Sequence, residues 1–344
     1  MHVYVPTLAP SDAVSDQARH QVRLLRSWGH DAVLVADGWH PDCDHEVIGL
    51  GRAFAEGPSC AWVVHFSIWA DGVADIVAAP GGPKILVFHN VTPPELVPPG
   101  LVADRCERAI SELPGLAGAW DLVIADSTFN AADLHAAGFG PVEVVPLLLP
   151  HTPPVARAER GDGVLFVGRI APSKGVDDLV KAFALLRRLH RPSATLDLVG
   201  SAAGWERYAA GLEALVERAG CDGITWRGAV SDEERDALYA RAGVVCLLSR
   251  HEGFCAPLVE AMRAGAPVVA RDVGAVAETL GGGGILLPDG DPRLAAEALA
   301  AVVNDPGLRE RLRAGAAGAL ARVEPDAVEE RLRATIGAAL GTGS

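Results

Sequence analysis

The chain has 344 residues, of which 49% are hydrophobic and 22% charged, so it carries enough apolar material for two buried cores. Its formal net charge at pH 7 is −14, and residues 1–150 hold 18 acidic against 7 basic side chains. This imbalance excludes nucleic acid and anionic lipid as expected partners of the first half. No apolar run reaches the roughly 20 residues of a membrane span, and the six cysteines form no C-x-x-C pair. We therefore expect a cytoplasmic protein with reduced thiols, no signal peptide and no membrane association.

The first 150 residues alternate apolar, strand-like runs with helical patterns, which is typical of a parallel sheet covered on both faces. Strands are predicted near 2–5, 32–36, 62–66, 85–89, 122–125 and 142–145. Helices are predicted at 12–28 and 101–119. Three prolines between positions 150 and 154 then break the pattern, and they indicate an extended linker between two domains.

The alternation restarts after this linker. Strands are predicted at 163–167, 195–199, 224–226, 244–248, 268–270 and 284–287. From Asp291 onward the spacing is helical and predicts closing helices, the last of which could cross back onto the first domain. The predicted fold is α/β, with two doubly wound Rossmann-like domains, 1–150 and 151–344, facing each other across a cleft. Ligand is expected at the carboxyl ends of the strands.

Two glutamates, Glu252 and Glu260, bracket a turn that opens a helix directly after the predicted strand 244–248. Pro257 is predicted as the first helical residue, where its missing N–H costs nothing. Glu260, one turn into the helix, could accept hydrogen bonds from a ribose diol, and Glu252 from sugar hydroxyls. Amides at a helix start can bind a diphosphate, and here they belong to Phe254, Cys255 and Ala256. The alternative interpretation is an acidic loop followed by a solvated helix.

Two cations follow the predicted strand 163–167. Arg169 and Lys174 lie in a glycine-flanked loop before the next helix. Arginine can bind two phosphate oxygens at once, and lysine acts as a point charge. The pair is therefore predicted to neutralise a diphosphate, although either residue alone would be read as an ordinary surface base.

As a set, these segments resemble the second domain of retaining glycosyltransferases of family 4, which have the GT-B fold. The resemblance covers roughly residues 163–300. It rests on Gly168-Arg169, Lys174-Gly175, Glu252-Gly253-Phe254, Glu260-Ala261-Met262 and the segment 265–270.

The resemblance implies transfer of a hexose-type sugar from a nucleoside diphosphate sugar to an acceptor hydroxyl, with retention at the anomeric carbon, without metal and without a cofactor. Residues 1–150 would bind the acceptor and residues 151–344 the donor, with segment 226–230 resembling the lining of a base pocket. The implied catalytic residues are His89, Arg169, Lys174 and Glu252. The implied nucleotide-sugar site comprises Gly168, Arg169, Lys174, Arg227, Gly228, Glu252, Gly253, Phe254, Cys255, Ala256, Val259 and Glu260.

The first half resembles the family more loosely. His89 stands where many members place a histidine beside the donor sugar, although a lone histidine here could equally cap a strand, and His65 is expected to have a core or supporting role. Two features depart from the family pattern. Residues 7–13 replace the usual Gly-Gly loop, and Cys255 replaces the second glycine of the Glu-Gly-Phe-Gly motif.

The first domain offers no obvious carboxylate nucleophile, so we expect front-face transfer through an oxocarbenium-like state. Two alternatives remain: a catalytically silent GT-B partner, against which the intact Arg169, Lys174, Glu252 and Glu260 argue, and a nucleotide-sugar epimerase or phosphorylase on a related scaffold. The acidic first half predicts a soluble neutral or cationic acceptor, such as an amino-sugar or aminocyclitol, unless the charge serves only solubility. The sequence leaves the base, the sugar and the oligomeric state open.

Overall fold

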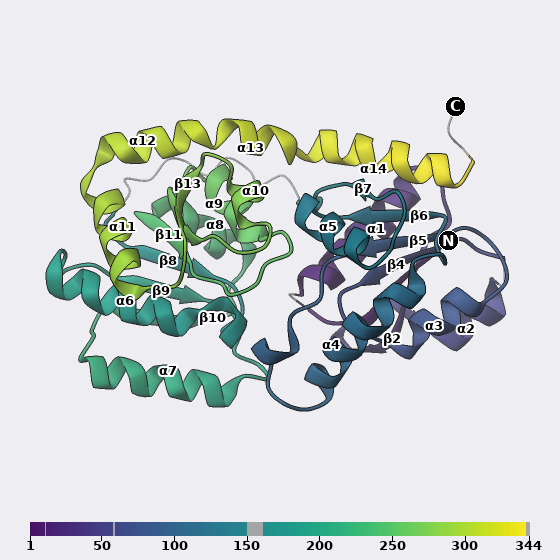
Figure 1. The fold of residues 1–344 in the computed structure, drawn as a ribbon, viewed down its shortest axis with the longest axis horizontal. Helices are drawn as coiled ribbons and strands as arrows, with labels where there is room; N and C mark the ends of the chain where they lie inside the picture. Colours follow the sequence, from purple (N-terminus) through teal and green to yellow (C-terminus); the bar gives the residue numbers. More distant parts are fainter. Residues whose placement is uncertain (11, 58, 150–160, 342–344) are drawn as a thin grey trace. The chain divides into compact units, whose positions relative to one another are not determined.

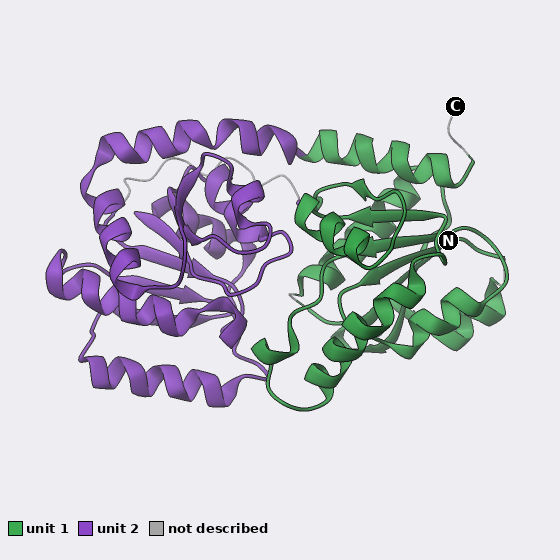
Figure 2. Ribbon diagram, viewed as in Figure 1, with its two compact units in different colours: residues 1–148, 325–344 green, residues 149–324 purple. Residues whose placement is uncertain are grey.

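The computed structural model describes residues 1–10, 12–57, 59–149 and 161–341. The chain divides into two compact units, shown in different colours in Figure 2. Unit 1 comprises Met1–Leu148 and Pro325–Ser344, and unit 2 comprises Leu149–Glu324. The division falls close to the boundary predicted near residue 150. The predicted linker prolines lie outside the described residues.

Unit 1 is built on a seven-stranded parallel sheet in the order β3-β2-β1-β4-β5-β6-β7. The strands are β1 (His2–Leu8), β2 (Val33–Trp39), β3 (Val47–Gly49), β4 (Trp62–Phe66), β5 (Lys84–Phe88), β6 (Leu122–Ala125) and β7 (Glu143–Val144). The sequence missed β3, because three residues are too few to show alternation. The other strands lie where they were predicted.

The helices of unit 1 cover both faces of this sheet (Figure 1). They are α1 (Ala13–Ser27), α2 (Leu50–Glu56), α3 (Asp71–Ala78), α4 (Leu101–Glu112) and α5 (Thr128–Ala136), with 3-10 turns η1 (Pro41–Cys43), η2 (Pro94–Leu96) and η3 (Leu113–Leu116). The helix predicted at 101–119 ends as an α-helix at Glu112 and continues as η3. Pro114 lies in η3, and a proline has no N–H for a further α-helical hydrogen bond.

The last helix, α14 (Pro325–Ala339), belongs to unit 1. The predicted bounds 151–344 of the second domain therefore extend too far, and the helix packs on the first domain, as the sequence left open. The physical reason is apolar packing. Val328 and Ile336 of α14 are almost fully buried in the same hydrophobic cluster as Leu25 of α1. The indole Nε1 of Trp28 also donates a hydrogen bond to Glu329 Oε1 at 3.3 Å.

Unit 2 holds a six-stranded parallel sheet in the order β10-β9-β8-β11-β12-β13. Its strands are β8 (Val164–Val167), β9 (Leu196–Val199), β10 (Ile224–Gly228), β11 (Val244–Leu247), β12 (Val268–Arg271) and β13 (Gly284–Leu287). Its helices are η4 (Pro172–Lys174), α6 (Val176–Leu189), α7 (Glu206–Ala219), α8 (Asp232–Arg241), α9 (Ala256–Arg263), α10 (Val276–Leu280), α11 (Pro292–Asn304), α12 (Pro306–Gly315) and α13 (Ala317–Arg322).

The strand order of unit 2 places β8 next to β11, at the point where the order of connections reverses. All four residues of β11 are buried, as expected for a central parallel strand. Ligands of such sheets bind beyond the carboxyl ends of the two strands at this point. The loops after β8 and β11 are those that carry the residues predicted from the sequence. None of the described helices combines the length and the apolar character needed to cross a bilayer.

Candidate active site

The loop after β11 delivers its residues to the start of α9. Pro257 is the second residue of this helix, one position later than predicted, and Cys255 is its N-cap. Cys255 has a φ of 70°, in the left-handed region that few residues other than glycine adopt. This backbone explains why a glycine fits the position and why the cysteine is strained there. Burial and the neighbouring Glu252 carboxylate raise the pKa of the Cys255 thiol well above its ordinary value, so the thiol stays protonated.

Glu252 and Lys174 form an ion pair in this site. Lys174 Nζ lies 2.7 Å from Glu252 Oε1, which also accepts a 2.7 Å hydrogen bond from Ser249 Oγ. The Glu252 side chain is only 9% exposed and that of Lys174 23%. Burial by itself raises the pKa of Glu252, but the Lys174 ammonium and the Ser249 hydroxyl outweigh it and hold the pKa below its usual value. The two residues that the sequence assigned to separate parts of a donor thus contact each other directly.

The loops that carry Lys174 and Glu252 are joined by Arg250. Its backbone N–H donates to Ser173 O at 2.7 Å, and its guanidinium donates to Pro172 O at 2.6 Å. The same guanidinium reaches both oxygens of Asp177 at 2.9 Å. Burial by itself raises the pKa of Asp177, but these bonds and one from Tyr208 lower it to about 2. Arg250 therefore fixes the distance between the two loops, a role that nothing in its local sequence indicates.

Gly175, directly after Lys174, is required by this close packing. Its φ is +62°, and a Cβ built at this position would lie 2.0 Å from Leu248 O. Gly220 has nearly the same backbone, with a φ of +54°, but a Cβ there meets nothing within 4 Å. The two glycines therefore form a matched pair that separates backbone strain from steric clash.

We expect Gly175→Ala to lower the free energy of unfolding more than Gly220→Ala does. Both substitutions place alanine in the left-handed region, at a cost of roughly 1–2 kcal/mol. Only the first also forces a side chain into a carbonyl, and overpacking of this kind adds about 1–3 kcal/mol. Urea denaturation of the two variants measures the difference. Equal losses would show that the loops can separate without cost.

Glu260 has two partners from α8. Tyr239 Oη donates to Glu260 Oε2 at 2.8 Å, and Arg235 Nε lies 3.9 Å from Glu260 Oε1. Tyr239 is 1% exposed, and its burial together with the Glu260 charge raises its pKa well above the ordinary value. The hydroxyl is therefore a permanent donor that fixes the orientation of the carboxylate. The sequence predicted Glu260 but missed Tyr239, because a lone tyrosine in a helix carries no distinguishing signal.

Arg169 is exposed and has no hydrogen-bond or ion-pair partner among the described residues, so its guanidinium is available to a ligand. Arg169 follows Gly168, whose carbonyl closely contacts the backbone of Gly200. A Cβ built at position 200 would lie 1.9 Å from Gly168 O. Arg169 and Lys174 both belong to the connection between β8 and α6, as predicted. Only Lys174 is held by a protein carboxylate.

The remaining predicted residues of unit 2 differ in their accessibility. Arg227 Nε contacts Asp197 Oδ1 at 2.7 Å at the edge of the sheet, and Gly228 takes part in a register shift of β10. Val259 is fully buried, and its contact with the donor remains a prediction. The backbone amides predicted to bind a diphosphate are those of Phe254, Cys255 and Ala256. None of the three donates a hydrogen bond to another described residue.

In unit 1, His89 follows β5 and is bound at both ring nitrogens. Its Nδ1 lies 2.7 Å from Asp126 Oδ2, and its Nε2 lies 2.7 Å from His65 Nδ1. The geometry is satisfied when His89 donates to Asp126 and His65 donates to His89. Burial raises the pKa of Asp126, and burial also lowers the pKa of His65 well below its ordinary value. A sugar could bind His89 Nε2 directly only if the hydrogen bond between this atom and His65 Nδ1 were broken.

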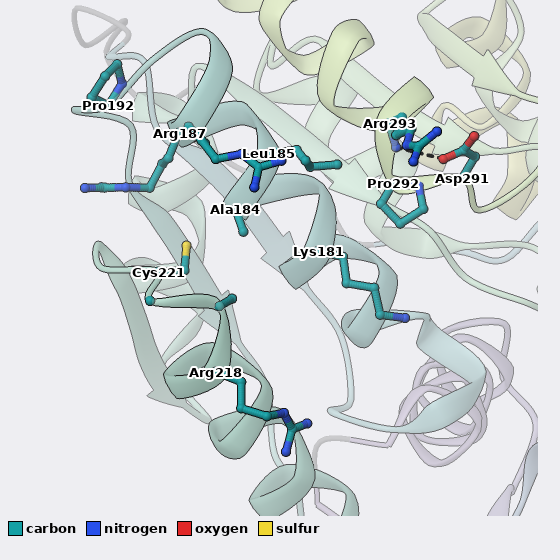
Figure 3. A pocket seen from close by; sticks show the side chains of 13 residues that line it. Lys181, Ala184, Leu185, Arg187, Pro192, Arg218, Cys221, Asp291, Pro292 and Arg293 are labelled. Carbon is teal, nitrogen blue, oxygen red and sulfur yellow. Dashed lines mark hydrogen bonds between the residues drawn. The ribbon is translucent and has the colours of Figure 1, made fainter.

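A separate cavity of about 720 Å³ lies along the outer side of α6, near the end of α7 and the start of α11 (Figure 3). Its lining is rich in basic residues, but Figure 3 shows the side chains of Arg187 and Arg218 pointing away from each other. Lys181, on the same lining, is paired with Asp177 and Asp178. These cations do not converge on a single anion, and the cavity is not part of the site at the strand ends.

Comparison with known proteins assigns the family. The sequence profile described as Glycosyl transferases group 1 matches residues 153–318. D-inositol 3-phosphate glycosyltransferase of Jonesia denitrificans is 32% identical over 289 residues, which cover 76% of this chain and 68% of the relative. The protein of the same name from Arthrobacter sp. is 30% identical over 357 residues, covering 90% and 83% of the two chains. The chain belongs to the group 1 glycosyltransferases.

This glycosyltransferase also shares its fold with solved structures over nearly its whole length. Anabaena HepE, solved in complex with UDP and glucose, superposes with a TM-score of 0.81 at 18% identity and covers 98% of this chain and 99% of its own. Sucrose-phosphate synthase from Thermosynechococcus elongatus gives 0.78 at 19% identity and covers 96% of both chains. The predicted GT-B fold with two Rossmann-like domains is confirmed.

Proposed function

We propose that this glycosyltransferase moves a hexose-type sugar from a nucleoside diphosphate sugar to an acceptor hydroxyl, with retention at the anomeric carbon and without a metal ion. The observation that carries the proposal is the Lys174–Glu252 ion pair in the loops that follow β8 and β11. It combines a cation for a leaving diphosphate with a carboxylate for sugar hydroxyls. The UDP and glucose with which HepE was solved support the donor class.

Each part of the donor finds a matching group in unit 2. The diphosphate would be bound by the exposed Arg169, by Lys174 and by the free amides at the start of α9, where the helix dipole also favours negative charge. The ribose diol would donate to Glu260, which Tyr239 already orients. The sugar hydroxyls would donate to Glu252, whose low pKa keeps it an acceptor at neutral pH.

The proposed reaction breaks the bond between the anomeric carbon and the diphosphate oxygen, and the electron pair leaves with the diphosphate. The acceptor oxygen forms its bond on the same face of the sugar, through an oxocarbenium-like state, and its proton passes to the leaving phosphate oxygen. Lys174, Arg169 and the helix start stabilise the charge that develops on the diphosphate. Groups of this kind contribute roughly 3–4 kcal/mol each when they are well placed.

The cations required for this reaction belong to the chain, so we propose that the enzyme needs no metal. Excess EDTA is expected to leave the rate of transfer, or of donor hydrolysis, within about twofold of the untreated enzyme. The same measurement after addition of Mg²⁺ or Mn²⁺ should show no gain. Loss of turnover in EDTA with recovery on addition of either metal would contradict this mechanism.

The proposal also includes the setting of the reaction. The six cysteines are all free, and five of them are buried, which supports a reducing, cytoplasmic location. No cofactor is proposed, because the reaction needs only the two substrates. Unit 1 is proposed to bind the acceptor, and the contact predicted between His89 and the donor sugar remains a prediction.

A further inference from the structure

Unit 1 contains a cavity of about 420 Å³ at the carboxyl ends of β1 and β2. The loop between β4 and α3 and one face of α4 complete its walls. Parallel sheets bind ligands at these strand ends, and the volume is that of a site for a small molecule. The residues that line the cavity all belong to unit 1.

Asp37 lines this cavity, and its carboxylate is held by two neighbouring groups. Its Oδ2 accepts hydrogen bonds from Tyr4 Oη at 2.8 Å and from the Gly72 N–H at 3.3 Å. Within the described residues its Oδ1 has no partner. Gly72 makes this arrangement possible, because a Cβ there would lie 2.5 Å from Asp37 Oδ1 and 2.6 Å from Tyr4 Oη. The carboxylate is therefore fixed through Oδ2, while Oδ1 lies beside Gly72 and has no hydrogen-bond partner among the described residues.

Asp71 repeats this arrangement on another wall of the cavity. Its Oδ1 accepts hydrogen bonds from Arg108 Nη1 at 2.9 Å and from Trp69 Nε1 at 3.3 Å. Its Oδ2 has no partner in the part of the chain that the structure describes. The Arg108 guanidinium lies 4.7 Å from the centre of the Trp69 ring, which holds it in place beside Asp71. Two oriented carboxylates thus line one cavity, and in each of them one oxygen has no hydrogen-bond partner among the described residues.

The charges of the lining select against an anion. Asp104 adds a third carboxylate, and among the described lining residues Arg105 is the only cation besides Arg108, which already pairs with Asp71. Free carboxylate oxygens accept hydrogen bonds from hydroxyl and ammonium groups. A phosphate would be repelled by three carboxylates. The exposed side chain of Leu101 supplies an apolar wall for the carbon atoms of a ring.

We propose that this cavity binds the acceptor and that the acceptor is a polyhydroxylated ring, a cyclitol or a sugar, that carries no phosphate and binds more tightly when it carries an amine. The proposal rests on the glycosyl transfer proposed above, and it specifies the acceptor. Several relatives are named for D-inositol 3-phosphate. The proposed acceptor therefore differs from the acceptor in the relatives' names, because it carries no phosphate group.

The test compares three related probes: an amino-deoxy-inositol, myo-inositol and D-inositol 3-phosphate. Their affinities are measured by calorimetric titration or ligand-observed NMR on the full-length protein. We expect the amino compound to bind at least tenfold more tightly than the phosphate, with myo-inositol between them. Tightest binding of the phosphate, or no binding of any of the three, overturns the proposal.

Variants locate the binding. Asp37→Asn and Asp71→Asn are each expected to weaken binding of the amino compound at least tenfold. Asp42→Asn, a change of the same kind at an exposed carboxylate outside the cavity, should leave it within twofold. The Asp71 side chain is 82% exposed, so its replacement is not expected to disturb folding. Unchanged affinity in both cavity variants overturns the assignment.

A parallel titration with UDP and GDP keeps this test separate from that of the donor site. Asp37→Asn and Asp71→Asn should bind nucleotide as the unmodified protein does. If no nucleotide binds to any form while the cyclitol result holds, the proposed donor chemistry fails and the acceptor cavity stands. If nucleotide binds normally but the cyclitol order is reversed, only the acceptor proposal fails.

Discussion

Lys174→Met is expected to lower kcat/KM by about 100- to 1000-fold. The substitution removes a cation from the leaving diphosphate, and the loss of one such stabilising group costs roughly 2.7–4 kcal/mol in the transition state. It also leaves Glu252, with its side chain 9% exposed, as an unpaired carboxylate in the site. Steady-state rates of transfer or donor hydrolysis, measured with thermal unfolding of the same samples, give both effects.

Two further variants make this result interpretable. Lys181→Met removes a lysine from α6 that is 44% exposed and pairs with Asp177 and Asp178, and it should keep activity within twofold. The double variant Lys174→Met/Glu252→Gln removes the unpaired charge, so it should recover thermal stability relative to Lys174→Met. It should not recover activity. A Lys174→Met enzyme with nearly full activity would show that the ion pair only supports the loops.

Glu260→Ala is expected to weaken binding of the cognate nucleoside diphosphate about 10- to 150-fold, because a hydrogen bond to a charged group contributes roughly 1.5–3 kcal/mol. The loss should be specific to the ribose. Calorimetry with UDP and GDP, and with their 2′,3′-dideoxy analogues, checks this directly. The unmodified protein should prefer the hydroxylated form of the nucleotide it binds, and Glu260→Ala should not distinguish the two forms.

Tyr239→Phe and Glu297→Ala serve as companions to this variant. Tyr239→Phe keeps the carboxylate but removes the hydroxyl that orients it, so a smaller loss is expected, with part of the ribose preference retained. Glu297, whose side chain is 62% exposed in α11, should be neutral when replaced by alanine. If Glu260→Ala keeps the preference for the ribose hydroxyls, the carboxylate does not bind the ribose.

The fold follows from the sequence because buried parallel strands appear as short apolar runs. β4, β6 and β13 have the predicted bounds, from Trp62, Leu122 and Gly284 onward. The assignment of α14 could not be obtained in this way. The positions of Val328 and Ile336 show that this helix has a buried face, but the pattern does not indicate which unit covers it.

The site was predictable in its parts but not in its connections. Lys174 and Glu252 were predicted separately, because each lies in a loop after a predicted strand and is followed by a glycine. Their ion pair joins residues 78 positions apart, and it depends on how closely the two loops pack. Arg250 and Tyr239 were missed for the same reason: an arginine in a loop and a tyrosine in a helix acquire a role only through partners distant in the sequence.

The most direct test is a crystal structure of the protein with whichever of UDP and GDP it binds. We expect the diphosphate to lie on Arg169, Lys174 and the amides that begin α9, and the ribose hydroxyls to lie on Glu260. Lys174 should remain within contact of both Glu252 and the nucleotide. A nucleotide bound elsewhere, or bound here through a metal ion with Lys174 still turned only to Glu252, would contradict the proposed function.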